Sequence, residues 1–110
     1  MNIVVKSRHM DVTDDVRKHV ESKVEKLSRY LGEIQTVEVT LDTEADKPFV
    51  EIIATARKKT TFVATARDED MIACIDHCFH RISEQVRRHK DKVRDRQGPP
   101  HGGTAGISGD

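Results

Sequence analysis

The chain has 110 residues, which suits one domain and leaves no room for two. It carries 19 Lys and Arg against 19 Asp and Glu, so its formal net charge is zero with His neutral, which excludes a uniformly basic nucleic-acid-binding protein. With no Trp, one Tyr and three Phe, it also lacks the rings for a surface that stacks bases.

The sequence shows no targeting or membrane segment. No apolar run approaches the ~20 residues that span a bilayer, and no apolar stretch with a small-residue cleavage site follows the N-terminus. Cys74 and Cys78 lie too close in sequence to form a disulfide framework. We therefore expect a cytoplasmic protein with reduced thiols and no membrane partner.

The first half of the chain predicts a strand, a helix and a second strand. Residues 3–6 are typical of a short strand, and Thr13 is a suitable N-cap for the helix that follows. Five apolar residues then recur at helical spacing, which predicts a helix from about 14 to 31: Val16, Val20, Val24, Leu27 and Leu31. Apolar and polar residues alternate over 37–42, as in a strand with one wet face.

The second half predicts two more strands and a long helix. In chain order we expect a turn over 42–48, a strand over 50–56, a hairpin turn over 57–60 and a strand over 61–67. Asp68 is the expected cap of a helix that runs from about 69 to 95. At 1.5 Å per residue this helix is roughly 40 Å long, so its end should project past the body of the domain.

These elements define an α+β fold with the order β-α-β-β-β-α. The helical crossover makes the first two strands parallel, and tight turns make the other pairs antiparallel. Each strand has one apolar face, so we expect a four-stranded mixed sheet with both helices packed on one face. The domain should span residues 1–96, and the Gly- and Pro-rich segment 97–110 should be a flexible tail.

The long helix separates apolar from basic side chains. On a helical wheel, one arc that should face the sheet holds Met71, Ile75, Cys78, Phe79, Ile82, Val86, His89 and Val93. The bordering stripe holds Arg81, Gln85, Arg88, Lys92 and Arg96. Residues 81–96 contain seven Lys or Arg against three acids, so the neutral total hides a polarised molecule.

The first helix adds Lys23 and Lys26 beside its own apolar arc. If the helices pack side by side, these lysines and the stripe of the second helix should form one basic groove, two helices wide. Lys and Arg neutralise phosphates, and Gln can bond to a sugar or a base. RNA is therefore the expected partner, and with few rings to stack bases, structured RNA is favoured over loose single strands.

Four stretches together resemble one known family. They are Asp-Glu-Asp-Met-Ile-Ala-Cys-Ile-Asp at 68–76, Arg81 and Gln85 with the run 88–92, and the segments 9–13 and 23–27. In this pattern the chain is similar to the ribosome hibernation-promoting factors, also called ribosome-associated inhibitors or sigma-54 modulation proteins. The likeness covers about residues 1–95 with the same element order. Ile72, Cys74 and Glu84 depart from it, because the family usually has Tyr, Ala and a basic residue there.

The resemblance implies a translation-silencing factor that is not an enzyme and needs no cofactor. Such a factor binds the small ribosomal subunit and its rRNA at the decoding region, in the channel that mRNA and tRNA use. It implies these RNA-binding residues: Lys23, Lys26, Arg81, Gln85, Arg88, Lys90 and Lys92. With 110 residues we expect no second domain of the long form; the chain resembles the short form, whose ribosome pairing can require a separate dimerising factor.

Two alternatives stay open on the residues alone. A double-stranded RNA-binding module has a similar layout, but it uses the start of its second helix, which here carries the acids at 68–70. A dimerisation module would use the open sheet face with Ile53 and Val63. A zinc site is not expected, because one helix cannot converge all four of its candidate ligands: Cys74, His77, Cys78 and His80.

Overall fold

The computed structural model describes residues 2–30 and 34–97 of the chain. In chain order the elements are β1 (Asn2–Arg8), α1 (Asp14–Tyr30), β2 (Ile34–Glu44), β3 (Lys47–Ala56), the short 3₁₀ turn η1 (Arg57–Lys59), β4 (Thr61–Arg67) and α2 (Met71–Gln97). The predicted order β-α-β-β-β-α is therefore confirmed. The predicted flexible tail lies, after Gln97, outside the described residues, and so does Leu31.

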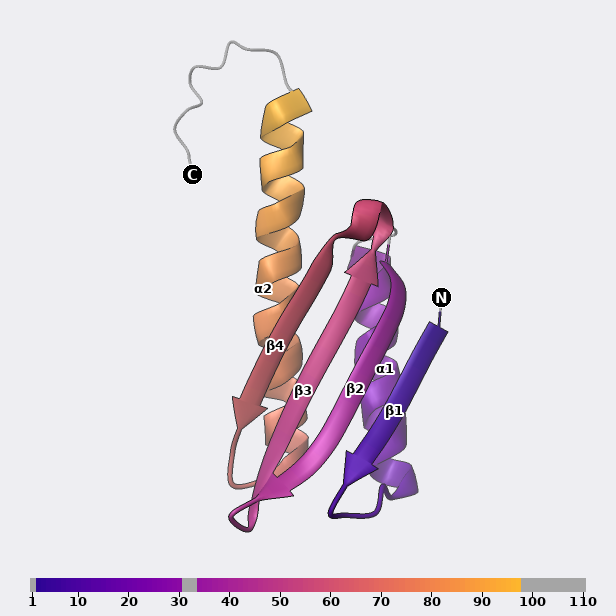
Figure 1. The fold of residues 1–110 in the computed structure, drawn as a ribbon, viewed down its shortest axis with the longest axis vertical. Coiled ribbons are helices and arrows are strands. Elements are labelled where there is room, and N and C mark those ends of the chain that lie inside the picture. The colour runs from indigo at the N-terminus through magenta and orange to yellow at the C-terminus, as the bar shows by residue number, and fades with distance from the viewer. Residues whose placement is uncertain (1, 31–33, 98–110) are drawn as a thin grey trace.

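The four strands form one mixed sheet in the order β1-β2-β3-β4 (Figure 1). β1 pairs with β2 in parallel, with α1 as the crossover, whereas β2–β3 and β3–β4 are antiparallel hairpins. The register brings Val39 opposite Ile52, and Ile52 opposite Ala64, so the apolar residues of neighbouring strands share one face.

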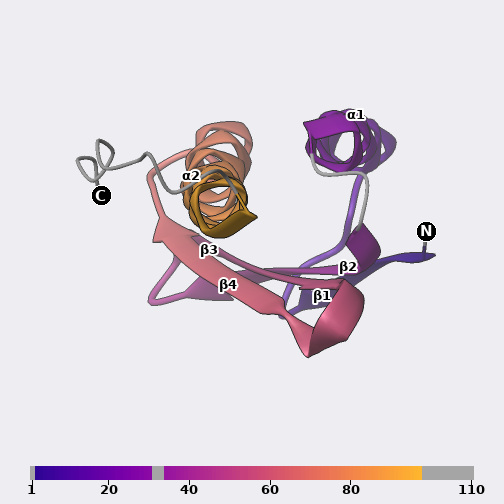
Figure 2. The same ribbon diagram turned by 90° about the horizontal axis from the view of Figure 1, so that it is seen from above.

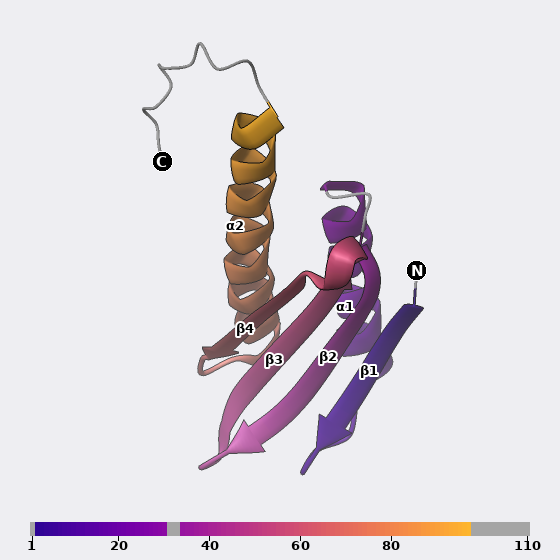
Figure 3. The same cartoon turned by 45° about the horizontal axis from the view of Figure 1, so that its top comes forward.

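Both helices cover that apolar face (Figure 2). α1 lies over β1 and β2, and α2 lies over β3 and β4. No helix or strand of the described residues covers the other face of the sheet, as Figure 3 also shows. The largest fully buried side chains come from both layers: Val37, Val39, Leu41, Val50 and Ile52 from the sheet, and Val20, Val24, Ile75, Ile82 and Val86 from the helices.

The helix caps explain where the helices start. Thr13 caps α1 as predicted, since its Oγ1 accepts the backbone N–H of Val16 at 3.2 Å. The prediction of Asp68 as the cap of α2 is wrong. The carboxylate of Asp70 accepts the N–H of Ala73 at 3.0 Å, and α2 begins at Met71. Asp68 and Asp70 both satisfy the sequence preference for a cap, and only the path of the chain selects between them.

The first hairpin turn is tighter than its sequence suggests, whereas the second lies within the predicted 57–60. The predicted turn over 42–48 is only two residues long, Ala45 and Asp46, with φ of 52° and 64°. In η1, Lys58 and Lys59 both have φ of 62°. The left-handed region costs a non-glycine residue about 1–2 kcal/mol, so these positions favour Gly or Asn. Because the first turn has neither residue, its sequence does not mark the two turn positions and predicts a broader turn.

α2 has 27 residues and extends beyond the end of the sheet in Figure 1, as its expected length predicted. Within the described segments, no helix combines the length and the apolar character required to cross a bilayer.

Candidate RNA-binding surface

The core fixes how α2 is rotated about its axis. Ile75, Cys78, Ile82 and Val86 are fully buried against β3 and β4, as the wheel predicted. Since α2 lies between α1 on one side and the free edge of β4 on the other, its two flanks face different neighbours (Figure 2). Every predicted RNA-binding residue of α2 can therefore be assigned to a flank.

The flank towards β4 carries the predicted stripe. Arg81 donates from Nη1 to the backbone oxygen of Thr65 at 2.7 Å, and Gln85 donates from Nε2 to that of Val63 at 2.6 Å. Both carbonyls lie on the free edge of the sheet, so these side chains cover backbone groups that an edge strand leaves unpaired. Arg88 and Lys92 follow at helical spacing on the same flank, and both are exposed.

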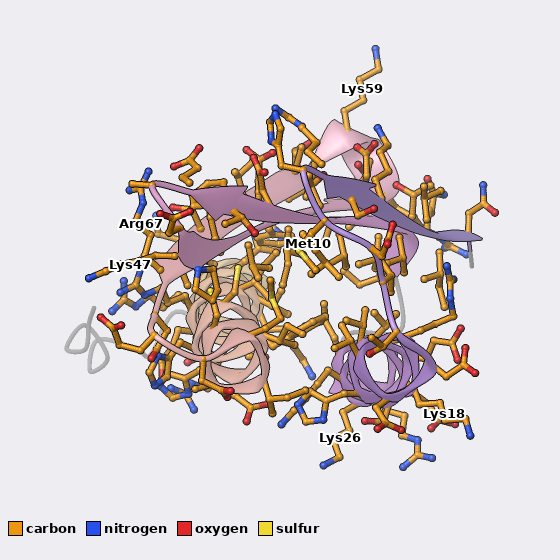
Figure 4. The ribbon with its side chains drawn as sticks, turned by 90° about the horizontal axis from the view of Figure 1, so that it is seen from below. Met10, Lys18, Lys26, Lys47, Lys59 and Arg67 are labelled. Carbon is orange, nitrogen blue, oxygen red and sulfur yellow. The ribbon has the colours of Figure 1, made fainter. Side chains whose placement is uncertain are left out.

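The flank towards α1 borders a cleft of about 660 Å³. The residues that line it are Lys23, Lys26, Leu27, Asp76, His77, Phe79, His80, Ser83, Glu84 and Arg87. Across this cleft, Asp76 accepts a hydrogen bond from His19 Nε2 at 2.6 Å and lies 3.3 Å from Lys23 Nζ. Lys26 is exposed, and Figure 4 shows it on the side of α1 away from the sheet.

The prediction of one basic groove two helices wide is therefore wrong in its geometry. Lys23 and Lys26 line the cleft between the helices, whereas Arg81 and Gln85 contact the β4 edge on the opposite flank of α2. Lys90 is half-buried and falls, by helical spacing, on the flank of Arg87. The seven predicted residues form two rows on either side of α2 rather than a single stripe.

Two carboxylates form ion pairs with cations that line the cleft. Although burial works in the opposite direction, the hydrogen bond from His19 and the ammonium of Lys23 keep the pKa of Asp76 below its usual range. The pKa of Glu84 is likewise lowered, chiefly by the hydrogen bond from Arg87. Both carboxylates are therefore ionised near neutral pH, and they compete with any polyanion for the neighbouring cations.

Two sets of residues at this surface have no signal in the apolar periodicity. Ser83 and Arg87 line the cleft but were assigned no role. Their position follows from the strand order, because the crossover places α1 over β1 and β2 and therefore on the β2 side of α2. The turn Arg57-Lys58-Lys59 was treated only as a hairpin, although all three of its side chains are cationic and exposed.

The fold sorts charge towards opposite ends of the molecule. The segments at the end where β1 finishes, over 8–15, 42–47 and 67–70, hold nine acids against three Lys or Arg, and Figure 4 views this end. Towards the opposite end lie the second half of α1, η1 and the later part of α2 (Figure 1). Segments 23–29, 57–59 and 81–92 hold eleven Lys or Arg against three acids. A chain with no net charge thus has a strongly basic half.

The cysteines belong to the core. The thiols of Cys74 and Cys78 donate to the backbone oxygens of Ala66 and Ala64 at 3.2 and 3.3 Å. Burial raises the pKa of both thiols, that of Cys78 to about 12, so they stay protonated and are poor metal ligands. Across residues 2–30 and 34–97, no three His, Cys, Asp or Glu residues lie together in a way that could hold a metal ion.

Comparison with known families identifies the domain. Residues 3–94 match the family described as Sigma 54 modulation protein / S30EA ribosomal protein. The chain belongs to this family. It is a family of ribosome hibernation factors, which are binding proteins rather than enzymes. The match confirms the family resemblance seen in the sequence.

Relatives of this S30EA-family chain carry the same description. It is 35% identical over 98 residues to a ribosome hibernation promoting factor of Azotobacter vinelandii, covering 88% of this chain and 90% of that protein. It is 28% identical to a ribosome hibernation promotion factor of Bacillus subtilis, covering 84% of this chain but only half of that protein.

Two solved structures share the fold of this S30EA-family domain. The N-terminal domain of Thermus thermophilus Protein Y aligns with a TM-score of 0.73 at 30% identity, covering 81% of this chain and 99% of that one. A ribosomal subunit interface protein from Coxiella burnetii aligns with a TM-score of 0.77 at 21% identity, covering 83% and 99%. The second likeness concerns the fold alone.

Proposed function

We propose that this protein silences ribosomes by binding the rRNA of the small subunit near the decoding region, where it occludes the mRNA and tRNA channel. The names of its relatives support ribosome hibernation as the biological role.

The main support for the proposal is that Lys and Arg are concentrated in one half of a molecule with no net charge. Lys26, Arg88 and Lys92 are exposed, and none of them forms an ion pair with a carboxylate among the described residues. Bringing such cations to phosphates releases counterions, which drives binding to RNA. The acidic end is repelled at the same time, so the charge distribution orients the domain with the later part of α2 towards the RNA.

The two rows of cations suit RNA on both sides of α2. Arg81 uses one N–H for the carbonyl of Thr65, and the guanidinium has four more donors for a phosphate. If Lys26, Arg81, Arg88 and Lys92 each contact one phosphate while Lys23 stays paired with Asp76, the affinity should fall about 50- to 150-fold between about 50 and 200 mM salt, at a slope of 0.7–0.9 per contact.

A pair of charge reversals tests which surface binds. We expect Arg88→Glu with Lys92→Glu to weaken binding to purified 30S subunits by more than about 25-fold at about 100 mM salt, since two phosphate contacts become repulsive. The matched control is Arg17→Glu with Lys18→Glu on the first half of α1, where both residues are exposed and Lys18 points away from α2 (Figure 4). Equal effects of the two pairs would show that the later part of α2 is not the binding surface.

A second measurement, of tRNA binding, tests whether the bound protein blocks the tRNA channel. Subunits saturated with the protein should fail to bind mRNA-directed tRNA, and the reversed variant should restore that binding at the same protein concentration. If tRNA binds normally to saturated subunits, the protein occupies another site and the occlusion mechanism is wrong.

A further inference from the structure

The turn η1, with Arg57, Lys58 and Lys59, is a strongly charged patch that the proposed binding surface does not use. All three residues are exposed, and none of them forms an ion pair with a described carboxylate. Figure 4 shows Lys59 pointing away from both helices, beyond the uncovered face of the sheet. The patch therefore presents its charge in a different direction from the two rows on α2.

The turn nevertheless lies at the basic end of the molecule. Along α2, Arg81 lies beside Thr65 and Gln85 lies beside Val63. The ring centroids of His89 and Phe62 are 5.5 Å apart. Continuing this register, the α2 residues after His89 reach the level of η1. Lys92 and the turn thus flank the same end of the sheet, one on the helical side and the other on the uncovered side.

The backbone of the turn favours residues other than lysine. Lys58 and Lys59 both have φ of 62°, a left-handed conformation that Gly and Asn adopt more readily. The turn is closed by backbone hydrogen bonds, with the N–H of Ala56 donating to Thr60 O at 2.8 Å, so nothing in its geometry requires a long cationic side chain. Lysine at both positions therefore adds charge where the fold alone would be better served by Asn-Gly.

We propose that η1 is a second RNA-binding site, which takes a phosphate backbone segment on the uncovered side of the sheet while α2 holds RNA on the helical side. This inference rests on the proposed function and extends it. RNA is the partner because three adjacent exposed cations, with no ion pair to a described carboxylate, recognise charge density rather than shape. The domain end would then be held between two RNA segments instead of lying against one.

The test replaces the two lysines by the residues that the turn prefers. Lys58→Asn with Lys59→Gly should raise the Tm by a few degrees, because the left-handed strain is relieved. The same variant should lower the affinity for purified 30S subunits about 25- to 60-fold at about 100 mM salt, and it should reduce the salt slope by about 1.4–1.8, as the loss of two phosphate contacts requires. Greater stability with weaker binding separates a contact from a folding defect.

Two controls complete the experiment. Ala45→Asn with Asp46→Gly makes the same change in the hairpin at the acidic end, where both residues also have positive φ, and it should raise the Tm without weakening binding. Arg17→Gln with Lys18→Gln removes two cations elsewhere and should change the affinity by less than about threefold.

The possible outcomes are distinguishable. Unchanged affinity in the turn variant, with binding still lost on Arg88→Glu and Lys92→Glu, overturns this inference and leaves the proposed function standing. Weaker binding with an unchanged salt slope also overturns it, because the turn would then contact protein rather than phosphates. If neither the turn variant nor the α2 variant affects binding, both proposals are wrong.

Discussion

Asp76 is the residue at which stability and RNA binding oppose each other most clearly. It lies on α2 facing α1, where it pairs with His19 at 2.6 Å and with Lys23 at 3.3 Å. Its own side chain is 42% exposed and that of Lys23 is 29% exposed. In the free protein this carboxylate stabilises the contact between the helices, but it also neutralises a lysine that the RNA is proposed to need.

Replacement of Asp76 by Asn should therefore lower stability and raise affinity. A partly exposed ion pair contributes about 0.2–1 kcal/mol, and the carbonyl oxygen of Asn can still accept the hydrogen bond from His19. Loss of the pair with Lys23 in Asp76→Asn should therefore cost about 1 kcal/mol or less, which lowers the Tm by at most about 4–8 °C. Release of Lys23 adds one phosphate contact. That contact should strengthen binding to 30S subunits about 5- to 8-fold at about 100 mM salt and steepen the salt slope by about 0.7–0.9.

The assay is a salt titration of 30S binding by sedimentation, with the Tm of each variant measured beside it. Glu69→Gln is a suitable control, since Glu69 pairs with Lys47 at 2.9 Å at the acidic end, so the substitution removes the same charge far from the cleft. An affinity that falls on Asp76→Asn would refute the reasoning, because Asp76 would then position Lys23 for RNA instead of competing with it.

Three further predictions follow from the fold. Asp70→Ala should destabilise the protein by about 1 kcal/mol through loss of the α2 cap, and Asp68→Ala should cost less; thermal melts that rank them the other way would refute the cap assignment. The hydrogen bond from His9 holds the pKa of Asp42 below its usual 3.8, so the stability from Asp42 is complete above that pH and lost as the pH falls through the lowered value. Asp42→Asn should flatten the acid limb of a Tm–pH profile. Because burial raises the pKa of Cys78 to about 12, the native protein should react with a thiol reagent only as fast as it unfolds, and rapid labelling at neutral pH would contradict its place in the core.

The periodicity of the sequence predicts the elements well because apolar spacing reports directly on burial. The strand over 61–67 agrees with β4 in both bounds, and the helix predicted from about 14 to 31 matches α1 within one residue over the described part. The bounds of the β2–β3 hairpin were wrong. Ala45 and Asp46 adopt left-handed backbone conformations without the Gly or Asn that marks a tight turn in a sequence.

The candidate site shows where periodicity stops being informative. The wheel places Arg81, Gln85 and Arg88 correctly beside the buried arc of α2, but it does not say which neighbour each flank faces. That depends on the strand order, which puts the free edge of β4 beside Arg81 and Gln85 and puts α1 on the opposite flank. The hydrogen bonds from Arg81 and Gln85 to the β4 edge follow from the same arrangement and have no signature in the sequence.

The central claim is that the basic half of this neutral molecule faces rRNA in the decoding region of the small subunit. A cryo-electron microscopy map of the protein bound to 30S subunits tests it most directly. We expect Arg88 and Lys92 to lie against rRNA phosphates in the tRNA path, with the acidic loops at 42–47 and 67–70 directed away from the RNA. A map in which those acidic loops face the RNA, or in which the domain lies outside the channel, would contradict the account.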